Sequence, residues 1–200
     1  MDDTTLAAYD ADAAGYARTW DTQAPPEDMY EQLRAHFSPG PTAEIGSGSG
    51  RDAAWLAANG FEPHGFDASA GLLARARAAH LGIPFDFAVL PGLDGVARGA
   101  WQNVLCETVI MHLPPAQIGP SVRSLLALLR PGGTLYLSWR ITADASTRDP
   151  AGRLYTAFDA SLVTDQLGAG DTILFDEDAT SVASGKRLRR LVVRRARPRD

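Results

Sequence analysis

The sequence predicts an α/β fold in which helices cover both faces of a mostly parallel sheet. A short apolar strand runs into a turn with glycine at alternate positions, and an alanine-rich helix begins at once. The glycines are Gly46, Gly48 and Gly50. Further along the chain, short apolar segments alternate with helical segments, an order that is typical of parallel sheets. Glycine lets the backbone adopt positive φ and lets a ligand approach closely, so the turn is predicted to hold a ligand.

Composition predicts one globular domain. Two hundred residues are enough for a sizeable core, and 45% hydrophobic with 22% charged residues is ordinary for a globular protein. The net charge of −5 argues against indiscriminate binding to nucleic acid or to an anionic membrane. The single cysteine, Cys106, excludes an internal disulfide framework, and the sequence has no signal peptide or long apolar run. We therefore expect a cytoplasmic protein.

The chain begins with two expected helices. Residues 4–20 are predicted to form one helix, because apolar side chains recur at helical intervals from Leu6 to Trp20. A loop is expected over residues 21–26 and a second helix over residues 29–37, after which turn-forming residues precede the first strand.

The helix after the glycine turn is expected to span residues 51–59 and to end at Gly60. A dinucleotide-binding turn needs a further glycine at its sixth position. Counted from Gly46, that position is Arg51, so the spacing argues against a nicotinamide cofactor.

The next strand, residues 61–67, places an acid at its carboxyl end. Asp67 follows the turn by about 20 residues, where a carboxylate can accept hydrogen bonds from both ribose hydroxyls. Alternatively, Asp67 only caps the following helix, although Ser69 already offers a cap there.

Three further strands are expected, at residues 85–89, 101–107 and 134–139. Cys106 lies within an apolar run, so we expect a small buried hydrophobe and not a nucleophile. Residues 115–130 form an amphipathic helix, whose regular part is expected to begin near Pro120 because proline is tolerated only near a helix start.

Three segments resemble class I S-adenosylmethionine-dependent methyltransferases, in the same order along the chain. Residues 44–50, Glu-Ile-Gly-Ser-Gly-Ser-Gly, resemble the first motif of that family. Residues 108–115 resemble the segment that faces the transferable methyl group in its small-molecule members. Residues 129–135, Leu-Arg-Pro-Gly-Gly-Thr-Leu, resemble the turn before its fifth strand. The resemblance implies a Rossmann-like three-layer sandwich with a mostly parallel seven-stranded sheet, an antiparallel C-terminal edge, and S-adenosyl-L-methionine as the cofactor.

The resemblance also implies a cofactor site at the carboxyl ends of the strands. Glu44 would shape the turn and lie near the methionine ammonium, and the N-terminal helix would fold over the cofactor unless its apolar stripe only packs on the core. Many relatives carry an acid where this sequence has Ala88, so the adenine is held either by backbone groups or by Asp86. The residues expected to bind the cofactor are Tyr16, Glu44, Gly46, Ser47, Gly48, Gly50, Arg51, Asp67, Ala68, Ala88, Val89, Leu90 and Thr108.

His112 lies at the mouth of the implied site. Its imidazole could take a proton from the attacking group, or it could hydrogen-bond a loop carbonyl and fix the loop, because histidine is common there in the family even where no base is needed. The polar segment 140–153 leaves a central strand, where loops carry specificity. Its arginines favour an anionic substrate group, unless Arg153 is only a surface charge. The residues expected to contact the substrate are Met111, Trp139, Arg140, Arg153 and Tyr155.

A helix over residues 155–167 and strands at 172–175 and 188–195 complete the expected elements. Basic residues gather along the last strand: Lys186, Arg187, Arg189, Arg190, Arg194, Arg195, Arg197 and Arg199. They form either a footprint for RNA or an exposed strand whose charges discourage edge pairing. No aromatic residues are interleaved to stack on bases, which argues against nucleic acid.

The sequence thus predicts a single methyltransferase domain over residues 1–200. Its parts are an N-terminal helical lid (1–37), a cofactor-binding core (40–140), and a substrate loop, helix and C-terminal strands (141–200). The expected reaction is methyl transfer from S-adenosylmethionine to an O, N or C nucleophile of a small-molecule acceptor by in-line displacement. Alternatives are an RNA-directed methyltransferase, a non-catalytic cofactor-binding protein and a nicotinamide-dependent oxidoreductase. The histidines outside the site, His36, His64 and His80, have no acidic or cysteine partners at ligand spacing, so no metal is expected.

Overall fold

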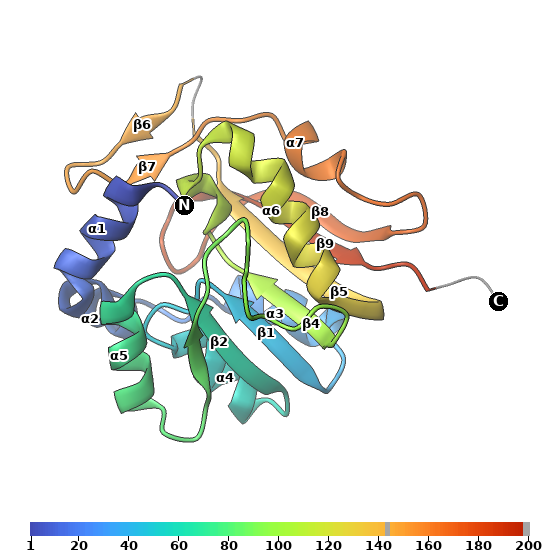
Figure 1. Ribbon diagram of the computed structural model, residues 1–200, viewed down its shortest axis with the longest axis horizontal. Helices are drawn as coiled ribbons and strands as arrows, with labels where there is room; N and C mark the ends of the chain where they lie inside the picture. Colours follow the sequence, from blue (N-terminus) through green and yellow to red (C-terminus); the bar gives the residue numbers. More distant parts are fainter. Residues whose placement is uncertain (143–144, 198–200) are drawn as a thin grey trace.

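The computed structural model, which describes residues 1–142 and 145–197, contains a seven-stranded sheet with helices on both faces (Figure 1). Its strands are β1 (Pro41–Ile45), β2 (Glu62–Asp67), β3 (Phe85–Phe87), β4 (Trp101–Cys106), β5 (Leu129–Arg140), β8 (Thr172–Thr180) and β9 (Arg187–Arg194). Their order is β3-β2-β1-β4-β5-β9-β8. The first five strands pair in parallel, whereas β9 runs antiparallel to both β5 and β8. The predicted sandwich with its antiparallel C-terminal edge is confirmed.

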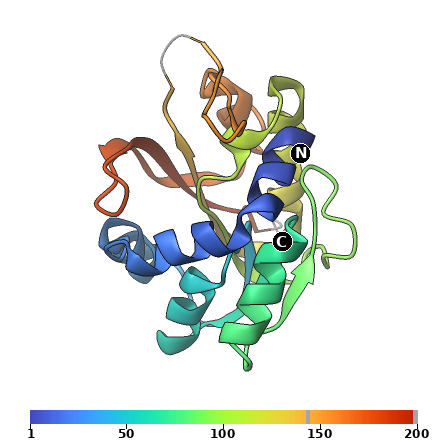
Figure 2. The same ribbon diagram turned by 90° about the vertical axis from the view of Figure 1, so that its left-hand side faces the viewer.

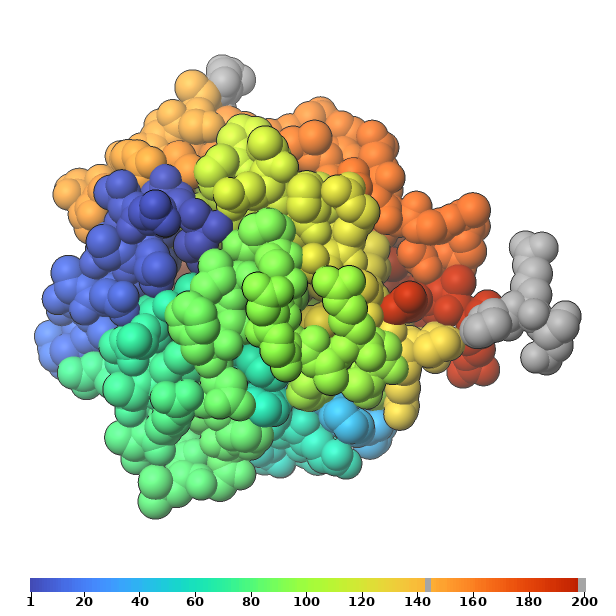
Figure 3. Space-filling model, viewed as in Figure 1, coloured from blue at the N-terminus to red at the C-terminus, as the bar shows by residue number. Residues whose placement is uncertain are grey.

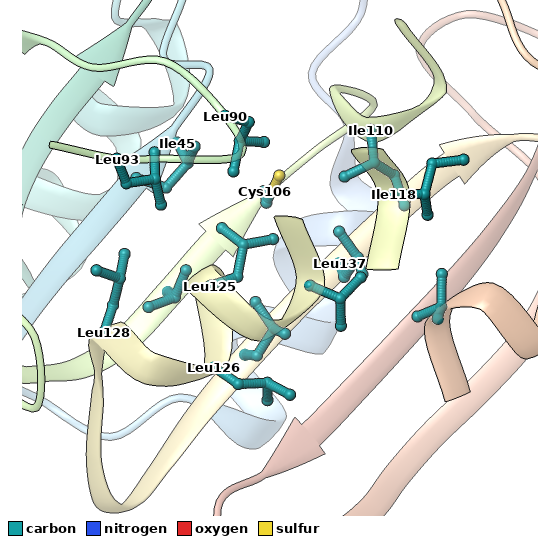
Figure 4. Packing of buried hydrophobic residues seen from close by; sticks show 14 of the residues in the cluster. Ile45, Leu90, Leu93, Cys106, Ile110, Ile118, Leu125, Leu126, Leu128 and Leu137 are labelled. Carbon is teal, nitrogen blue, oxygen red and sulfur yellow. The ribbon is translucent and has the colours of Figure 1, made fainter. Parts of the chain in front are cut away.

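Each face of the sheet has its own apolar core. On one face, α6 (Pro115–Leu128) packs over Val104 and Cys106, and Figure 4 shows Cys106 in the same apolar cluster as Leu125 of this helix. On the other face, α3 (Glu27–His36) and α4 (Arg51–Ala58) pack over Leu105. The alternation along β4 follows from the period of two in a strand. Cys106 is fully buried, as predicted.

The N-terminal segment forms two helices where one was predicted. α1 (Asp3–Ala11) ends at Asp12, and α2 (Ala13–Thr22) begins there, because the Asp12 carboxylate accepts a hydrogen bond from the Gly15 amide at 2.9 Å. The single-helix prediction was wrong for a local reason, since aspartate competes for backbone N–H groups and favours N-caps over helix interiors.

Both N-terminal helices lie against the rest of the domain. Figure 2 shows α1 and α2 beside α5 (Ala70–Ala79), and α1 also lies beside a small hairpin made of β6 (Thr147–Arg148) and β7 (Leu154–Tyr155) (Figure 3). The Arg148 guanidinium donates to both Asp2 carboxylate oxygens, at 2.9 and 2.8 Å. The Leu154 amide donates to the Thr5 hydroxyl at 2.8 Å. We call these contacts, which join Asp2 to Arg148 and Thr5 to Leu154, the Asp2–Leu154 clasp.

The α6 helix begins at Pro115, so the prediction of a start near Pro120 was wrong. Pro120 lies inside the helix, where it cannot donate to the Ala116 carbonyl one turn earlier. Ala116 is exposed, so water can take that hydrogen bond. Across the described ranges, no helix has the length and hydropathy of a membrane-spanning segment.

The segment 129–133 leads from α6 into the sheet. Trp101 of β4 pairs with Leu129 and Asn103 with Thr134, so the Pro-Gly-Gly turn bulges out between two paired positions. Gly132 has φ of 77°, which explains the glycine at this position.

The segment 155–167 is mostly irregular, so the predicted helix there was wrong. Only α7 (Ser161–Thr164) is helical, because Tyr155 pairs with Thr147 and the Thr156 amide donates to the Met111 carbonyl at 2.8 Å. These tertiary hydrogen bonds hold the chain extended against the sheet.

The basic residues of β9 lie among acids. Arg189 pairs with Asp176 of β8 at 2.8 Å, and Arg187 lies 3.8 Å from Asp178. Arg190 is buried and pairs with Asp28 of α3. Arg199 lies outside the described residues.

The Arg190–Asp28 pair predicts a large loss of stability. Replacing Arg190 by Met should lower the free energy of unfolding by about 3 kcal/mol, because the Asp28 charge would stay in place without its partner. The matched control is Arg187→Met on the same strand, whose side chain is 67% exposed and whose loss should cost less than about 0.5 kcal/mol. Urea unfolding measures both variants, and equal losses would show that the pair does not stabilise the fold.

Candidate active site

The turn between β1 and α4 is fixed by backbone hydrogen bonds and by packing. The amides of Gly46 and Ser47 both donate to the Phe66 carbonyl of β2, at 2.7 and 3.0 Å. Gly46 has φ of 82°, and a Cβ there would lie 2.2 Å from a methyl group of Val109. Gly48 has φ of 55° and lies under the Trp20 ring. Side chains at these two positions would therefore strain the backbone and collide with neighbours.

Asp67 connects the glycine turn to the end of β2. Its Oδ2 accepts a hydrogen bond from the Gly48 amide at 2.8 Å, and its Oδ1 accepts one from the Ser69 amide at 2.8 Å. Ser69 caps α5 as predicted, by accepting from the Leu72 amide. Burial raises the pKa of Asp67 in spite of these donors. Each carboxylate oxygen keeps a second lone pair for a ligand hydroxyl.

Two adjoining cavities open at the carboxyl ends of β1 and β4. The smaller has a volume of ≈ 100 Å³ and the larger ≈ 450 Å³. Of the predicted residues, Asp67, Ala68, Ala88 and Leu90 line the smaller cavity. Other predicted residues line the larger cavity: Tyr16, Glu44, Ser47, Arg51, Met111, Arg140, Arg153 and Tyr155. The residues that line both are Tyr9, Trp20, Gly46, Gly48, Glu107, Thr108 and His112.

Four residues considered for the site lie elsewhere. Gly50 is the N-cap of α4, and a Cβ there would meet His80 and Phe85 and not a cavity. Trp139 is buried in the core against Phe158. Asp86 of β3 is paired with His64 of β2 at 2.8 Å and lines neither cavity, which favours the backbone alternative for adenine. Val89 accepts from the Leu93 amide in the loop after β3 and is not among the residues that line the two cavities.

An acidic group forms one wall of the larger cavity. Glu44 and Asp52 both line it, and Asp52 is held by two bonds from Arg51 at 2.9 and 3.0 Å and by the Tyr30 hydroxyl at 2.7 Å. Burial, together with the Asp52 charge, raises the pKa of Glu44 well above its usual range, although Arg51 opposes the shift. A cationic group in the cavity would favour the charged form of Glu44.

The buried polar atoms of this wall fit the amino-acid end of S-adenosylmethionine. Among the described residues, Glu44 Oε2 and the hydroxyls of Ser47 and Ser49 are buried without a hydrogen-bond partner. A carboxylate oxygen suits an ammonium group, and hydroxyls can donate to a carboxylate. The methionine portion of the cofactor carries both groups, and Asp67, the predicted ribose ligand, lines the smaller cavity. No cluster of metal-ligating side chains occurs in residues 1–142 and 145–197.

His112 is hydrogen-bonded at both ring nitrogens. Nδ1 lies 2.6 Å from the Leu154 carbonyl, which can only accept, so Nδ1 carries the proton. Nε2 lies 3.0 Å from the Tyr9 hydroxyl and accepts a hydrogen bond from it. Burial lowers the pKa of His112 to about 4. The neutral imidazole therefore joins α1 to β7, which is the positioning role that the sequence left open beside the catalytic one.

Arg153 stands among aromatic rings at the other wall. Its guanidinium lies 4.7 Å from the ring centre of Tyr16 and 5.3 Å from that of Tyr9, and it pairs with Asp149 at 2.7 Å. Arg140 lies 4.9 Å from the ring centre of Tyr155. Arg153 is thus not a free surface charge, because it packs on aromatic side chains of α1 and α2.

Sequence reasoning missed several residues that line the cavities. Tyr9 and Trp20 belong to the apolar stripe of the N-terminal segment, yet only Tyr16 was selected from it. Lys186 was treated as part of the basic strand, although it lines the larger cavity. Glu107 directly follows the apolar run of β4, which is the one signal that could have identified it, because this end of a parallel strand faces ligands.

Comparisons with known proteins find this arrangement among methyltransferases. Residues 43–133 match the family described as a methyltransferase domain. No curated protein sequence matches the chain.

Three solved structures illustrate the likeness of fold. 1,6-Didemethyltoxoflavin-N1-methyltransferase from Burkholderia thailandensis, with 1,6-didemethyltoxoflavin and S-adenosylhomocysteine bound, is 20% identical over 96% of this chain and 88% of that chain, with a TM-score of 0.77. An S-adenosylmethionine-bound amino pentose methyltransferase from Micromonospora echinaspora is 20% identical over 92% and 96%, with a TM-score of 0.68. A putative methyltransferase in complex with the Trm112 activator from Haloferax volcanii is 13% identical over 98% and 99%, with a TM-score of 0.73.

The position of Asp67 gives a test of the cofactor site. Replacing Asp67 by Ala should weaken S-adenosylhomocysteine binding about tenfold or more, because hydrogen bonds to a charged group contribute about 1.5–3 kcal/mol each. Asp67→Asn keeps an acceptor for the Gly48 amide and should lose less affinity. Titration calorimetry measures both variants, with Asp86→Ala, which lies outside the cavities, as the control. Unchanged affinity in Asp67→Ala would exclude Asp67 as the ribose ligand.

Proposed function

We propose that this class I S-adenosylmethionine-dependent methyltransferase transfers the methyl group to a small-molecule acceptor held in the larger cavity. The observation that carries the proposal is the pair of adjoining cavities at the carboxyl ends of β1 and β4. The smaller suits the nucleoside of the cofactor, and the acidic wall suits its amino-acid end. The methyl group would then lie near Thr108 and Glu107, which line both cavities.

The size and cover of the larger cavity support a small acceptor. Its volume of ≈ 450 Å³ lies within the range of about 300–1,000 Å³ that is usual for small-molecule sites. The Asp2–Leu154 clasp holds α1 against the β6–β7 hairpin at one side of this cavity. A site closed in this way would exclude water and help to align the reacting atoms for in-line displacement. S-adenosylmethionine supplies a methyl group activated by its sulfonium charge, and the residues of this chain orient the acceptor toward it.

An RNA substrate has less support. Two of the β9 arginines that were candidates for an RNA footprint are engaged within the protein: Arg189 pairs with Asp176 and Arg190 with Asp28. Arg195 donates to the carbonyls of Leu126 and Leu129. These side chains stabilise the sheet and its helices, which supports the interpretation of a charged edge over that of a nucleic-acid surface.

Isotope transfer tests the proposed function. Incubating the protein with S-adenosylmethionine labelled in the methyl group and with pools of small metabolites should yield labelled small products, detected by mass spectrometry. An RNA pool is the matched arm. Label in RNA alone would contradict the small-molecule proposal. Label in neither pool, with the cofactor bound, would favour a non-catalytic binding protein.

Replacing Arg140 tests whether the acceptor carries a negative charge. Arg140 lines the larger cavity above the Tyr155 ring, where a guanidinium can bind a carboxylate or phosphate group through two parallel hydrogen bonds. With an anionic acceptor, Arg140→Gln should raise KM about tenfold and change kcat little, since the loss would weaken binding in ground and transition states alike. Steady-state kinetics measure both constants. A fall in kcat at unchanged KM would contradict a binding role for Arg140.

A further inference from the structure

The transfer of a methyl group to a protonated acceptor needs a place for the proton. His112 is poorly suited, because Nδ1 donates to the Leu154 carbonyl and Nε2 accepts from Tyr9. Its side chain is also buried, at 3% exposure. Another group at the junction of the two cavities is therefore needed.

Glu107 occupies that junction. It follows the last residue of β4, lines both cavities and is partly exposed toward them. The next residue, Thr108, has φ of 54°, an uncommon conformation for a residue with a side chain. The Thr108 amide donates to the Ser138 hydroxyl at 3.0 Å, and that hydroxyl donates to Glu107 Oε2. This short network fixes the carboxylate at the junction of the two cavities.

The charges around Glu107 come from three elements packed against it. Burial raises the pKa of Glu107 from its ordinary 4.5 to about 7, and the Asp52 charge at the start of α4 adds to this rise. The Ser138 hydrogen bond, Arg190 of β9 and the Tyr136 hydroxyl of β5 act in the opposite direction. A base with a pKa near the working pH combines a large ionised fraction with a useful affinity for the proton.

We propose that Glu107 is the proton acceptor of the methyl transfer, and that the acceptor molecule presents an ammonium or a phenolic hydroxyl to it. The inference rests on the proposed function. Glu107 takes the proton from the nitrogen or oxygen, whose electron pair forms the new bond to the methyl carbon. The carbon–sulfur bond breaks, and its electron pair stays on sulfur. The products are the methylated acceptor, S-adenosylhomocysteine and protonated Glu107, so charge and atoms balance.

Amines and phenols suit this carboxylate better than aliphatic alcohols do. The pKa values of ammonium groups and phenolic hydroxyls are about 8–10. The difference between these pKa values and that of Glu107 is therefore small. The rings of Tyr9, Tyr16 and Tyr155 in the same cavity offer stacking surfaces and cation-binding faces for such acceptors.

The test compares Glu107→Gln with wild type, using an acceptor found by isotope transfer. Glutamine keeps the shape of the side chain and an oxygen for Ser138, so the fold should be retained. We expect kcat to fall about 100-fold or more, in line with the usual contribution of a general base. Binding of S-adenosylhomocysteine, measured by calorimetry, should stay within about threefold of wild type, since the variant removes a group that acts in the transition state. The wild-type rate should rise with pH through about 7, and this limb should vanish in Glu107→Gln.

Two controls separate catalysis from structure. Asp86→Asn, a carboxylate outside both cavities, should leave the rate and its pH dependence unchanged, whereas Glu107→Asp should recover part of the activity. Because the carboxyl has a raised pKa in the folded protein, its contribution to stability is present below about 4.5 and is lost as the pH rises through about 7. Glu107→Gln should therefore remove that fall in stability, measured by urea unfolding at several pH values.

The outcomes distinguish the two proposals. If wild type methylates a small molecule and Glu107→Gln keeps its rate and pH profile, the assignment of Glu107 is wrong and the proposed function stands. A variant that loses cofactor affinity in proportion to its rate would make Glu107 a cofactor ligand and overturn its role as base. If wild type methylates no small molecule, the proposed function fails and this inference fails with it. Product analysis separates N-methylation from O-methylation, and a C-methylated product would overturn the predicted acceptor class.

Discussion

The turn between β1 and α4 is the constraint on which the rest of the site depends. The Phe66 carbonyl accepts from two successive amides, which forces the chain to reverse within a few residues of the strand end. Val109 fills the space where a side chain of Gly46 would stand, so β4 approaches β1 closely at their carboxyl ends. Because both strands end at the same level, the residues that follow them, Ser47 on one side and Glu107 on the other, reach the same volume. A bulkier turn would separate these strand ends and with them the two cavities.

Acidic and basic side chains line different parts of this volume. The acidic wall is anchored from below by Arg51 and Tyr30, which satisfy Asp52 and leave Glu44 without a partner for one oxygen. The opposite wall is built from arginines laid on tyrosine rings, where the charge is partly neutralised by Asp149. A ligand that carries charges of both signs fits such a cavity, because a cationic end would favour the charged form of Glu44 and an anionic end would meet the arginines. The distribution of charged side chains in the cavity therefore follows from the fold. The fold brings the first turn of α4 and the β6–β7 hairpin to the same cavity.

The sequence predicted the sheet and the cofactor turn, whose signals are local: glycine spacing, apolar runs and an acid at a strand end. It failed where tertiary contacts override local preference. Asp12 takes the Gly15 amide and divides one apparent helix into two, and the pairing of Tyr155 with Thr147 prevents the helix expected after it. In the site, too, local signals were predicted and tertiary contacts were not. His112 was found from its motif, but its tautomer is set by Leu154 and Tyr9, which lie 42 and 103 residues away in the chain. Glu107 was missed because burial, which gives a carboxyl unusual chemistry, cannot be read from a single acidic residue.

The N-terminal helices α1 and α2 contribute side chains to both cavities. Tyr9 and Trp20 line both, and Tyr9 is also the partner of His112. Any displacement of α1 that carries Tyr9 away breaks that hydrogen bond and uncovers both cavities together. Release of the Asp2–Leu154 clasp would therefore open both cavities at one place.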